Sequence, residues 1–280
     1  MLLFDKTEID FLLKTKAKTH FLNPHLFGRI NYMSEIAVAE DWQKISSELE
    51  SASPQEILRW ALEKFPLTLT MATAFGAEGC AVIDMLVKLA EETSLFPDIF
   101  NLDTGYQFPQ TLALRERIQD KYHIHVRMVS AKESVAELEK RNGGPMYKTD
   151  PDQCCYLRKV VPLREAVADF DAFITSIRRD QTPERAKAPI VGVDEKMGII
   201  KVNPLANWTK QQVWDYIDEH DVPVNPLHEQ GFPSIGCWPC TKAVSAGEDD
   251  RAGRWAGREK RECGLHIPLQ DKAGSGHVNF

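Results

Sequence analysis

The feature that most constrains the fold is a repeated alternation of short apolar runs with segments of helical periodicity. Apolar runs of strand length predict buried strands at four places: 67–72, 99–102, 123–129 and 173–177. Apolar residues at helical spacing predict helices before and between them: 54–65, 81–89, 109–122 and 134–141. Strands that alternate with helices in this way form parallel sheets. The sequence therefore predicts an α/β fold with a doubly wound, mostly parallel sheet.

The second half of the chain extends this sheet and then changes character. Apolar runs at 190–193 and 199–202 predict a β-hairpin at a sheet edge. Pro162 is expected to split the helical run that begins near Cys154. From Asp221 onward the chain is rich in loops. We therefore expect three parts: an N-terminal extension of uncertain order (1–50), the α/β domain (51–240) and a mobile C-terminal tail (241–280).

Length and charge exclude several classes of protein. A chain of 280 residues can bury a full core without disulfides or metals to stabilise it. The formal net charge of −7 argues against bulk binding of nucleic acid, so an anionic ligand would need local basic clusters. No apolar run approaches the roughly 20 residues of a membrane span, and the first residues lack the pattern of a signal peptide. We expect a cytoplasmic protein, in which paired cysteines more often bind metal or do redox chemistry than form structural disulfides.

Four of the six cysteines form two tight pairs, Cys154-Cys155 and Cys237-x-x-Cys240. Four thiolates are the ligand count of a zinc site or of an iron–sulfur cluster. Directly adjacent cysteines fit structural zinc poorly, whereas a cluster spreads its ligands over several irons. The spacing favours a cluster, with zinc second and unliganded buried cysteines third. Cys80 lies on the apolar side of a predicted helix and is most simply a core residue.

Cys263 stands apart from these pairs, in the segment Arg261-Glu262-Cys263-Gly264-Leu265-His266. Cationic neighbours lower the pKa of a thiol and so favour the thiolate, which is the reactive form. Basic residues gather in the dozen positions before it: Arg251, Arg254, Arg258, Lys260 and Arg261. This field favours Cys263 as a nucleophile. The alternative is a surface cysteine in a solvated tail.

Residues suited to binding an anion follow the predicted strands. The loop 73–79 lies between a strand and a helix and can present backbone N–H groups to a phosphate, although a plain turn has the same pattern. Asp103-Thr104-Gly105-Tyr106 follows the next strand, at the end where open α/β sheets bind ligands. Basic side chains occur at three further places: Arg178, Arg179 and Arg185 after a strand, Lys159 one helical turn after Cys155, and the arginines before Cys263. Each group alone could be solvated surface, but together they would form an anion pocket.

These motifs resemble those of a known family. The pieces that carry the resemblance span roughly residues 65–267 and are Phe75-Gly76-Ala77-Glu78-Gly79, Leu102-Asp103-Thr104-Gly105-Tyr106, Cys154-Cys155-x-x-Arg158-Lys159, Arg178-Arg179-Asp180-Gln181, Gly236-Cys237-x-x-Cys240, Arg251-x-x-Arg254 and Glu262-Cys263-Gly264-Leu265-His266. The chain resembles the assimilatory adenosine 5′-phosphosulfate (APS) reductases of the wider phosphoadenosine phosphosulfate (PAPS) reductase family. The cysteine pairs with the terminal Glu-Cys-Gly-Leu-His are highly specific, whereas the glycine loop alone is weak.

The resemblance implies an adenine nucleotide alpha hydrolase-like fold whose loop-rich tail carries the nucleophile. It implies a 4Fe–4S cluster held by Cys154, Cys155, Cys237 and Cys240. It also implies that Cys263 attacks APS, that AMP leaves, and that thioredoxin then releases sulfite from a cysteine S-sulfonate. The substrate contacts that we assign on this basis are Thr73, Gly76, Asp103, Thr104, Gly105, Lys159, Arg178, Arg185, Arg251, Arg254 and His266. We expect a homo-oligomer, with neither nucleic acid nor membrane as a partner.

The sequence departs from the family pattern in its glycine loop. Many relatives with a cluster have Ser-Gly-Ala-Glu-Asp there, whereas Phe75 and Gly79 replace the serine and the aspartate, which leaves Thr73 as the hydroxyl contact. No thioredoxin-like domain follows Cys263, so we expect an external reductant.

Two alternative functions remain. The first is an enzyme that acts on PAPS as well as, or instead of, APS. In the family the four-cysteine set goes with APS, so we expect APS to be preferred. The second is a non-redox PP-loop ATP pyrophosphatase with a structural metal. That class should carry a Ser-Gly-Gly-x-Asp-Ser loop, which this chain lacks.

Overall fold

The computed structural model describes residues 40–260 and 262–265, in which six strands form one sheet in the order β3-β2-β1-β4-β6-β5. The strands are β1 (Leu69–Thr73), β2 (Asp98–Asp103), β3 (Val126–Ser130), β4 (Ala172–Ile174), β5 (Val191–Asp194) and β6 (Ile199–Val202). Neighbouring strands are parallel except β5 and β6, which pair antiparallel at the edge. The predicted parallel sheet and its edge hairpin are confirmed.

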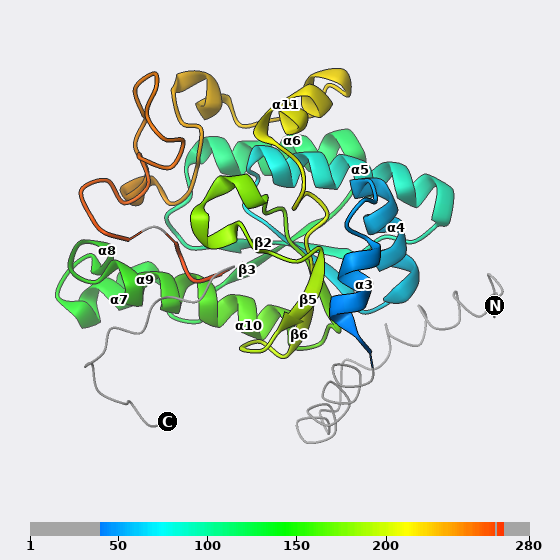
Figure 1. Ribbon diagram of the computed structural model, residues 1–280. Coiled ribbons are helices and arrows are strands. Elements are labelled where there is room, and N and C mark those ends of the chain that lie inside the picture. The colour runs from blue at the N-terminus through cyan, green and yellow to red at the C-terminus, as the bar shows by residue number, and fades with distance from the viewer. Residues whose placement is uncertain (1–39, 261, 266–280) are drawn as a thin grey trace, which may run out of the picture. The chain divides into compact units, whose positions relative to one another are not determined.

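The α-helices of the described residues connect or flank these strands. They are α3 (Trp42–Glu48), α4 (Pro54–Lys64), α5 (Ala77–Thr93), α6 (Pro109–Tyr122), α7 (Val135–Asn142), α8 (Met146–Thr149), α9 (Pro151–Cys155), α10 (Val161–Val167) and α11 (Lys210–Glu219). Helices α5 and α6 lie on one face of the sheet, and α10 lies on the other (Figure 1). Because β1 lies between β2 and β4, the winding reverses there, and open α/β sheets bind ligands beyond the strand ends at such a reversal.

Local capping signals explain where the helices begin. Ser53 Oγ accepts a hydrogen bond from the N–H of Glu56, whose carboxylate accepts one from the N–H of Ser53 at 2.7 Å. Pro54 occupies the first turn, where its missing N–H costs nothing. The same capping box starts α7 at Ser134 and α11 at Thr209. The starts of α4 and α7 agree with the predicted ones to within a residue.

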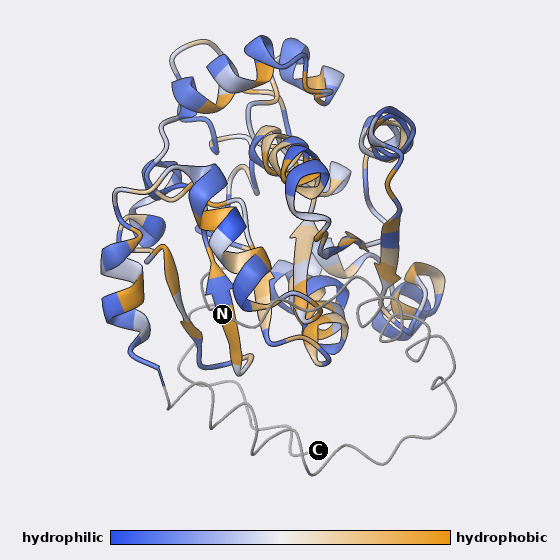
Figure 2. Ribbon diagram, turned by 90° about the vertical axis from the view of Figure 1, so that its right-hand side faces the viewer, coloured by the Kyte–Doolittle hydropathy of each residue, from blue (hydrophilic) through white to orange (hydrophobic). Residues whose placement is uncertain are grey.

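The core lies between the sheet and its helices. The strands are coloured mostly as hydrophobic in Figure 2, whereas the helices carry both hydrophobic and hydrophilic residues. Leu58, Met71, Leu86 and Phe173 are among the residues that are almost fully buried. Cys80 is also fully buried on α5, and the prediction that it is a core residue is confirmed. No helix in the described ranges is long and apolar enough to cross a membrane.

Two local predictions need correction. Strand β3 begins at Val126 rather than 123, because His123 has a φ of 53° and ends α6 in the left-handed conformation. Pro162 does not split the helical run, because a π-helical turn (Tyr156–Val160) joins α9 directly to α10. Pro162 lies in the first turn of α10, where a proline is tolerated.

Helix α3 lies within the part of the chain that was expected to be an extension. Trp42 stacks on Phe65 with a centroid separation of 6.3 Å, and Ser46 Oγ accepts the backbone N–H of Ile190 at 3.0 Å. These contacts join α3 to the sheet edge and to α4. The prediction for residues 1–39 lies outside the described residues.

Candidate active site

The loop after β1 forms one wall of a cavity of about 360 Å³ at the carboxyl end of the sheet. Thr73 and Gly76 line this cavity, which we call the cleft. Phe75 is buried with a φ of 54°, and its N–H donates to Thr73 Oγ1 at 3.0 Å. A Cβ at Gly79 would lie only 2.8 Å from the same oxygen. The loop conformation therefore depends on a buried Phe75 and on a glycine at position 79.

The predicted basic residues converge on the cleft. Its lining includes Lys159, Arg178, Arg185, Arg251 and Arg254, together with Cys263. They come from the π-helical turn, from the segment after β4 and from the tail, which are far apart in sequence. Arg179 is an exception, because its guanidinium forms hydrogen bonds with Glu50 and the carbonyl oxygen of Ala188. The cleft therefore has the donors of an anion pocket, apart from Arg179.

The Cys263 thiol is half-buried at the cleft. Burial acts to raise its pKa, but the Lys159 ammonium, the backbone N–H of Leu265 and the Arg254 guanidinium outweigh burial, so that the pKa stands below its ordinary value. A lowered pKa favours the thiolate, as a nucleophile requires. His266, predicted as a substrate contact, lies outside the described residues.

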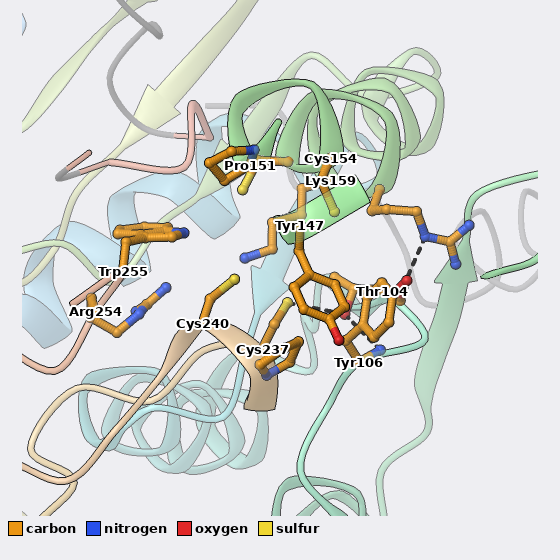
Figure 3. Close-up of a pocket in the computed structure, with 13 residues that line it drawn as sticks. Thr104, Tyr106, Tyr147, Pro151, Cys154, Lys159, Cys237, Cys240, Arg254 and Trp255 are labelled. Atoms are coloured by element: carbon orange, nitrogen blue, oxygen red, sulfur yellow. Dashed lines mark hydrogen bonds between the residues drawn. The ribbon is translucent and has the colours of Figure 1, made fainter. Parts of the chain in front are cut away.

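A smaller cavity adjoins the cleft and is lined by the four paired cysteines Cys154, Cys155, Cys237 and Cys240. In Figure 3, Cys154, Cys237 and Cys240 are arranged around one space, with Lys159 pointing toward it. Lys159 and Arg254 line both cavities. Among the described residues, no group of three or more histidine, cysteine, aspartate or glutamate side chains is arranged to hold a single metal ion. We call this space the cysteine cavity.

The walls of the cysteine cavity are largely apolar. Cys154 packs in a buried cluster with Tyr106, Leu138 and Met146. Burial raises the pKa of the Cys154 thiol to about 11 and that of the Cys155 thiol to about 12. Four thiols around one space are the donor set of a 4Fe–4S cluster, which satisfies such thiols as thiolates. The residues present therefore fit this cofactor.

The turn after β2 supports the cysteine cavity. Thr104 Oγ1 lies 3.3 Å from Cys237 Sγ and lines both cavities. The Asp103 carboxylate accepts a hydrogen bond from the N–H of Gly105 at 2.8 Å. Gly105 has a φ of 74°, and a Cβ at this position would overlap the side chain of Val135. Neither Asp103 nor Gly105 is among the described residues that line the cleft. These two residues shape the turn that presents Thr104, and their contact with substrate stays a prediction.

The tail is anchored beside both cavities. Trp255 is buried, and its backbone N–H donates to the carbonyl oxygen of Cys240 at 2.9 Å. Lys260 forms an ion pair with Asp152 of α9. Arg254 stacks over Trp255, with its guanidinium carbon 4.5 Å from the ring centroid. These contacts hold residues 254–260 against Cys240 and helix α9.

Comparisons with known proteins identify the family. Residues 68–243 match the phosphoadenosine phosphosulfate reductase domain. The chain is 43% identical over 227 residues to a phosphoadenosine 5′-phosphosulfate reductase of Gloeobacter violaceus, a match that covers 80% of this chain and 92% of the relative. It is 40% identical over 240 residues to an adenosine 5′-phosphosulfate reductase of Shouchella clausii, covering 85% and 98%. The chain belongs to the PAPS reductase family.

Solved structures place this family member among nucleotide-binding folds. A PAPS reductase of Candida auris, in a phosphate complex, has a TM-score of 0.63 at 35% identity and covers 72% of this chain and 95% of its own. An FMN adenylyltransferase of Candida glabrata has a TM-score of 0.50 at 15% identity, covering 78% and 77%, which indicates a shared fold alone. The predicted α/β fold with a mostly parallel sheet is confirmed.

The cleft of this family member is also lined by residues that were not predicted as site residues, among them Gln107, His228 and Gln181, which appeared only within a motif. His228 Nδ1 lies 2.9 Å from the carbonyl oxygen of Phe232, which makes Nδ1 the protonated nitrogen. Its Nε2 is buried without a hydrogen-bond partner among the described residues. It can therefore accept a hydrogen bond from a ligand. A single histidine in a loop-rich segment carried no signal in the sequence.

Proposed function

We propose that this protein is a thioredoxin-dependent APS reductase that makes sulfite and AMP. The observation that carries the proposal is that Cys263 shares one cleft with the loop after β1 and with Lys159, Arg178, Arg185, Arg251 and Arg254. A cavity of about 360 Å³ is in the size range of small-molecule sites. Membership of the PAPS reductase family supports a sulfonucleotide substrate.

The proposed reaction has two steps. The Cys263 thiolate attacks the sulfur of APS, an S–S bond forms, and the S–O bond breaks so that AMP leaves with the electron pair. Lysine and arginine donors in the cleft stabilise the negative charge that grows on the phosphate. A thioredoxin thiolate then attacks Cys263 Sγ and releases sulfite. Its second thiol resolves the mixed disulfide, so oxidised thioredoxin and the Cys263 thiol result.

The 4Fe–4S cluster is part of the proposal, with Cys154, Cys155, Cys237 and Cys240 as its ligands. Support comes from the four thiols that line one cavity. When bound, the cluster would join the end of α9 to the loop that carries Cys237 and Cys240. Lys159 reaches this cavity and the cleft, so one ammonium faces both. Iron and sulfide analysis of anaerobically purified protein should give about four of each per chain.

APS is proposed as the preferred substrate, and PAPS is the second candidate. The Gloeobacter violaceus relative, named as a PAPS reductase, is the observation that favours PAPS. The Shouchella clausii, Rhodococcus opacus and Salinibacter ruber relatives are named as APS reductases, which favours APS. We predict a kcat/KM for APS at least about tenfold above that for PAPS. A thioredoxin-coupled assay with each nucleotide measures this ratio, and a ratio of one or less would reject the preference.

The decisive experiment is a single turnover without reductant. Mixing the enzyme with APS should add one SO₃ group per chain and release one AMP. Mass spectrometry should place the adduct on the peptide that contains Cys263, and reduced thioredoxin should remove it as sulfite. AMP release without an adduct, or no reaction at all, would contradict the proposal. The expected homo-oligomer and cytoplasmic location stay predictions for light scattering and cell fractionation.

A further inference from the structure

Glu262, the residue directly before Cys263, has a buried carboxylate. Arg185 Nε donates to Glu262 Oε1 and Arg185 Nη2 donates to Glu262 Oε2, each at 2.8 Å. Arg251 Nη2 lies 3.5 Å from Glu262 Oε2, and Thr182 Oγ1 donates to Oε1 at 3.4 Å. The side chains of Glu262 and Arg185 are each only 7% exposed. The carboxylate is therefore surrounded by donors from two other parts of the chain.

This ion pair restricts where Cys263 can lie. Two parallel hydrogen bonds between an arginine and a carboxylate fix orientation as well as distance. Consecutive Cα atoms are about 3.8 Å apart, so a fixed Glu262 leaves Cys263 little freedom. Cys263 then lies at the cleft, where Lys159 and Arg254 act on its thiol.

Arg185 is itself held in place from the opposite side. Its Nη1 donates to Gln181 Oε1 at 2.5 Å, and Gln181 Nε2 donates to Glu78 Oε1 at 3.0 Å. Glu78 lies in the first turn of α5, directly after the loop that lines the cleft. A continuous chain of hydrogen bonds therefore runs from the first turn of α5 to the residue before the nucleophile.

We propose that Glu262 is a positioning residue that docks the tail on Arg185 and so presents Cys263 to the substrate. The inference deepens the proposed function and rests on it for the reaction that is measured. It also gives Arg185 a different role from the predicted substrate contact, because all three of its guanidinium nitrogens bond to Glu262 or Gln181. Glu262 and Arg185 then act as a unit.

The test is a double-mutant cycle on the full-length holoenzyme: Glu262→Gln, Arg185→Gln and both together. In single turnover with APS, Glu262→Gln should lower the limiting rate of S-sulfonate formation about 100-fold, because a small displacement of the nucleophile has an effect of that size. The APS concentration for half-maximal rate should not rise, since the substitution removes no lysine or arginine donor from the cleft. Because the pair acts as a unit, the double variant should be no slower than the slower single variant.

Limited proteolysis tests docking independently of the chemistry. Lys260 is 6% exposed in its ion pair with Asp152. Tryptic cleavage after Lys260 should become about tenfold faster in Glu262→Gln, because loss of the anchor favours local opening. The matched control is Glu259→Gln, which makes the same change at an exposed position nearby and should match the wild type in both assays.

Three results would overturn the proposal: a wild-type rate of S-sulfonate formation in Glu262→Gln, unchanged tryptic cleavage after Lys260, or additive losses in the double variant. If the wild-type enzyme forms no S-sulfonate, the proposed function fails instead. The proteolysis arm would still decide whether Glu262 holds the tail.

Discussion

The Lys159 ammonium acts to lower the pKa of both Cys155 and Cys263, yet the pKa values of the two thiols shift in opposite directions. Burial raises the pKa of Cys155 to about 12, although Lys159 and Lys260 act against it. Burial also acts on Cys263, but there Lys159 is joined by the N–H of Leu265 and by Arg254, and the pKa falls below its ordinary value. Nearby ammonium groups alone therefore do not make a thiol reactive, and the additional donors at Cys263 decide.

The additional donors come from the tail itself. Arg254 belongs to the turn that begins the tail, and Leu265 follows the nucleophile by two residues. Cys155 instead ends α9, which packs beside the cysteine cavity. The surroundings that lower the pKa of Cys263 therefore depend on how the tail folds back. The position of Cys155, the proposed cluster ligand, depends instead on helix α9.

The largest effect should come from removing the Cys263 thiol. Cys263→Ser should lose at least about 10⁴-fold in kcat, because the hydroxyl is not ionised and no S-sulfonate can form. It should keep its iron and still bind APS, as measured by iron analysis and equilibrium dialysis. Cys80→Ala is the control. This variant should form the adduct on Cys263 at the normal rate, because Cys80 is buried in the core away from the substrate. Turnover by Cys263→Ser, or a sulfonate found on Cys80, would break the comparison.

The next effect concerns the other thiol. Cys155→Ser should lose nearly all of its iron and nearly all of its activity, because a hydroxyl replaces one of four thiolate ligands. Iron, sulfide and activity should be measured on the same anaerobic preparation. Cys263→Ser serves as the matched control, since it should lose activity and keep iron. A Cys155→Ser protein with full iron would show that the two thiols do not differ in role.

Lys159, which the two thiols share, should give an intermediate effect. Lys159→Met should slow S-sulfonate formation about 100-fold, because it removes a charged donor from the cleft. Lys159→Arg should lose less, and Lys148→Met is an exposed control that should lose nothing. Single-turnover rates with APS measure the loss. If Lys159→Met reacted at the wild-type rate, Lys159 would not be one of the donors that assist the reaction at Cys263.

The smallest effect should come from Gly236→Ala. A Cβ at this position would overlap the Arg254 guanidinium, so the side chain must move. Because Arg254 distinguishes the surroundings of Cys263, we expect about a tenfold slower S-sulfonate formation. Iron content should stay at the wild-type level, since the thiol of Cys237 is unchanged. A loss of iron instead of rate would mean that the glycine serves the cysteine cavity.

Much of the fold could be predicted, because it rests on local patterns. The start of α4 follows from Ser53-Pro54 and that of α11 from Thr209, which are short-range signals. The end of α6 at Tyr122 was predicted, but the left-handed conformation of His123 was not, because the sequence pattern places the next strand directly after the helix. The π-helical turn was also missed, since it differs from an α-helix only in which carbonyl each N–H reaches.

The site was predictable by residue type and less so by role. The basic residues that line the cleft were named, but convergence depends on the order of the strands, which the sequence does not state. Arg179 was grouped with Arg178, yet Arg178 is extended whereas Arg179 begins a 3₁₀ turn, and the Arg179 guanidinium reaches Glu50. Glu262 was quoted within a motif but had no assigned role, because its partner lies 77 residues away.

The π-helical turn has a consequence for insertions and deletions in this protein. Such a turn holds one more residue than an α-helical turn would, and each residue of an α-helix turns the chain by about 100°. Deleting one residue between Tyr156 and Val160 would therefore let a regular α-helix form, with Leu163 and Val167 still in the buried positions that they occupy in α10. A regular α-helix of unchanged length would instead rotate these two residues by about 100° relative to Cys154 and Cys155. The wide turn is therefore what allows a segment of this length both to present its cysteines to the cavity and to pack α10 on the sheet.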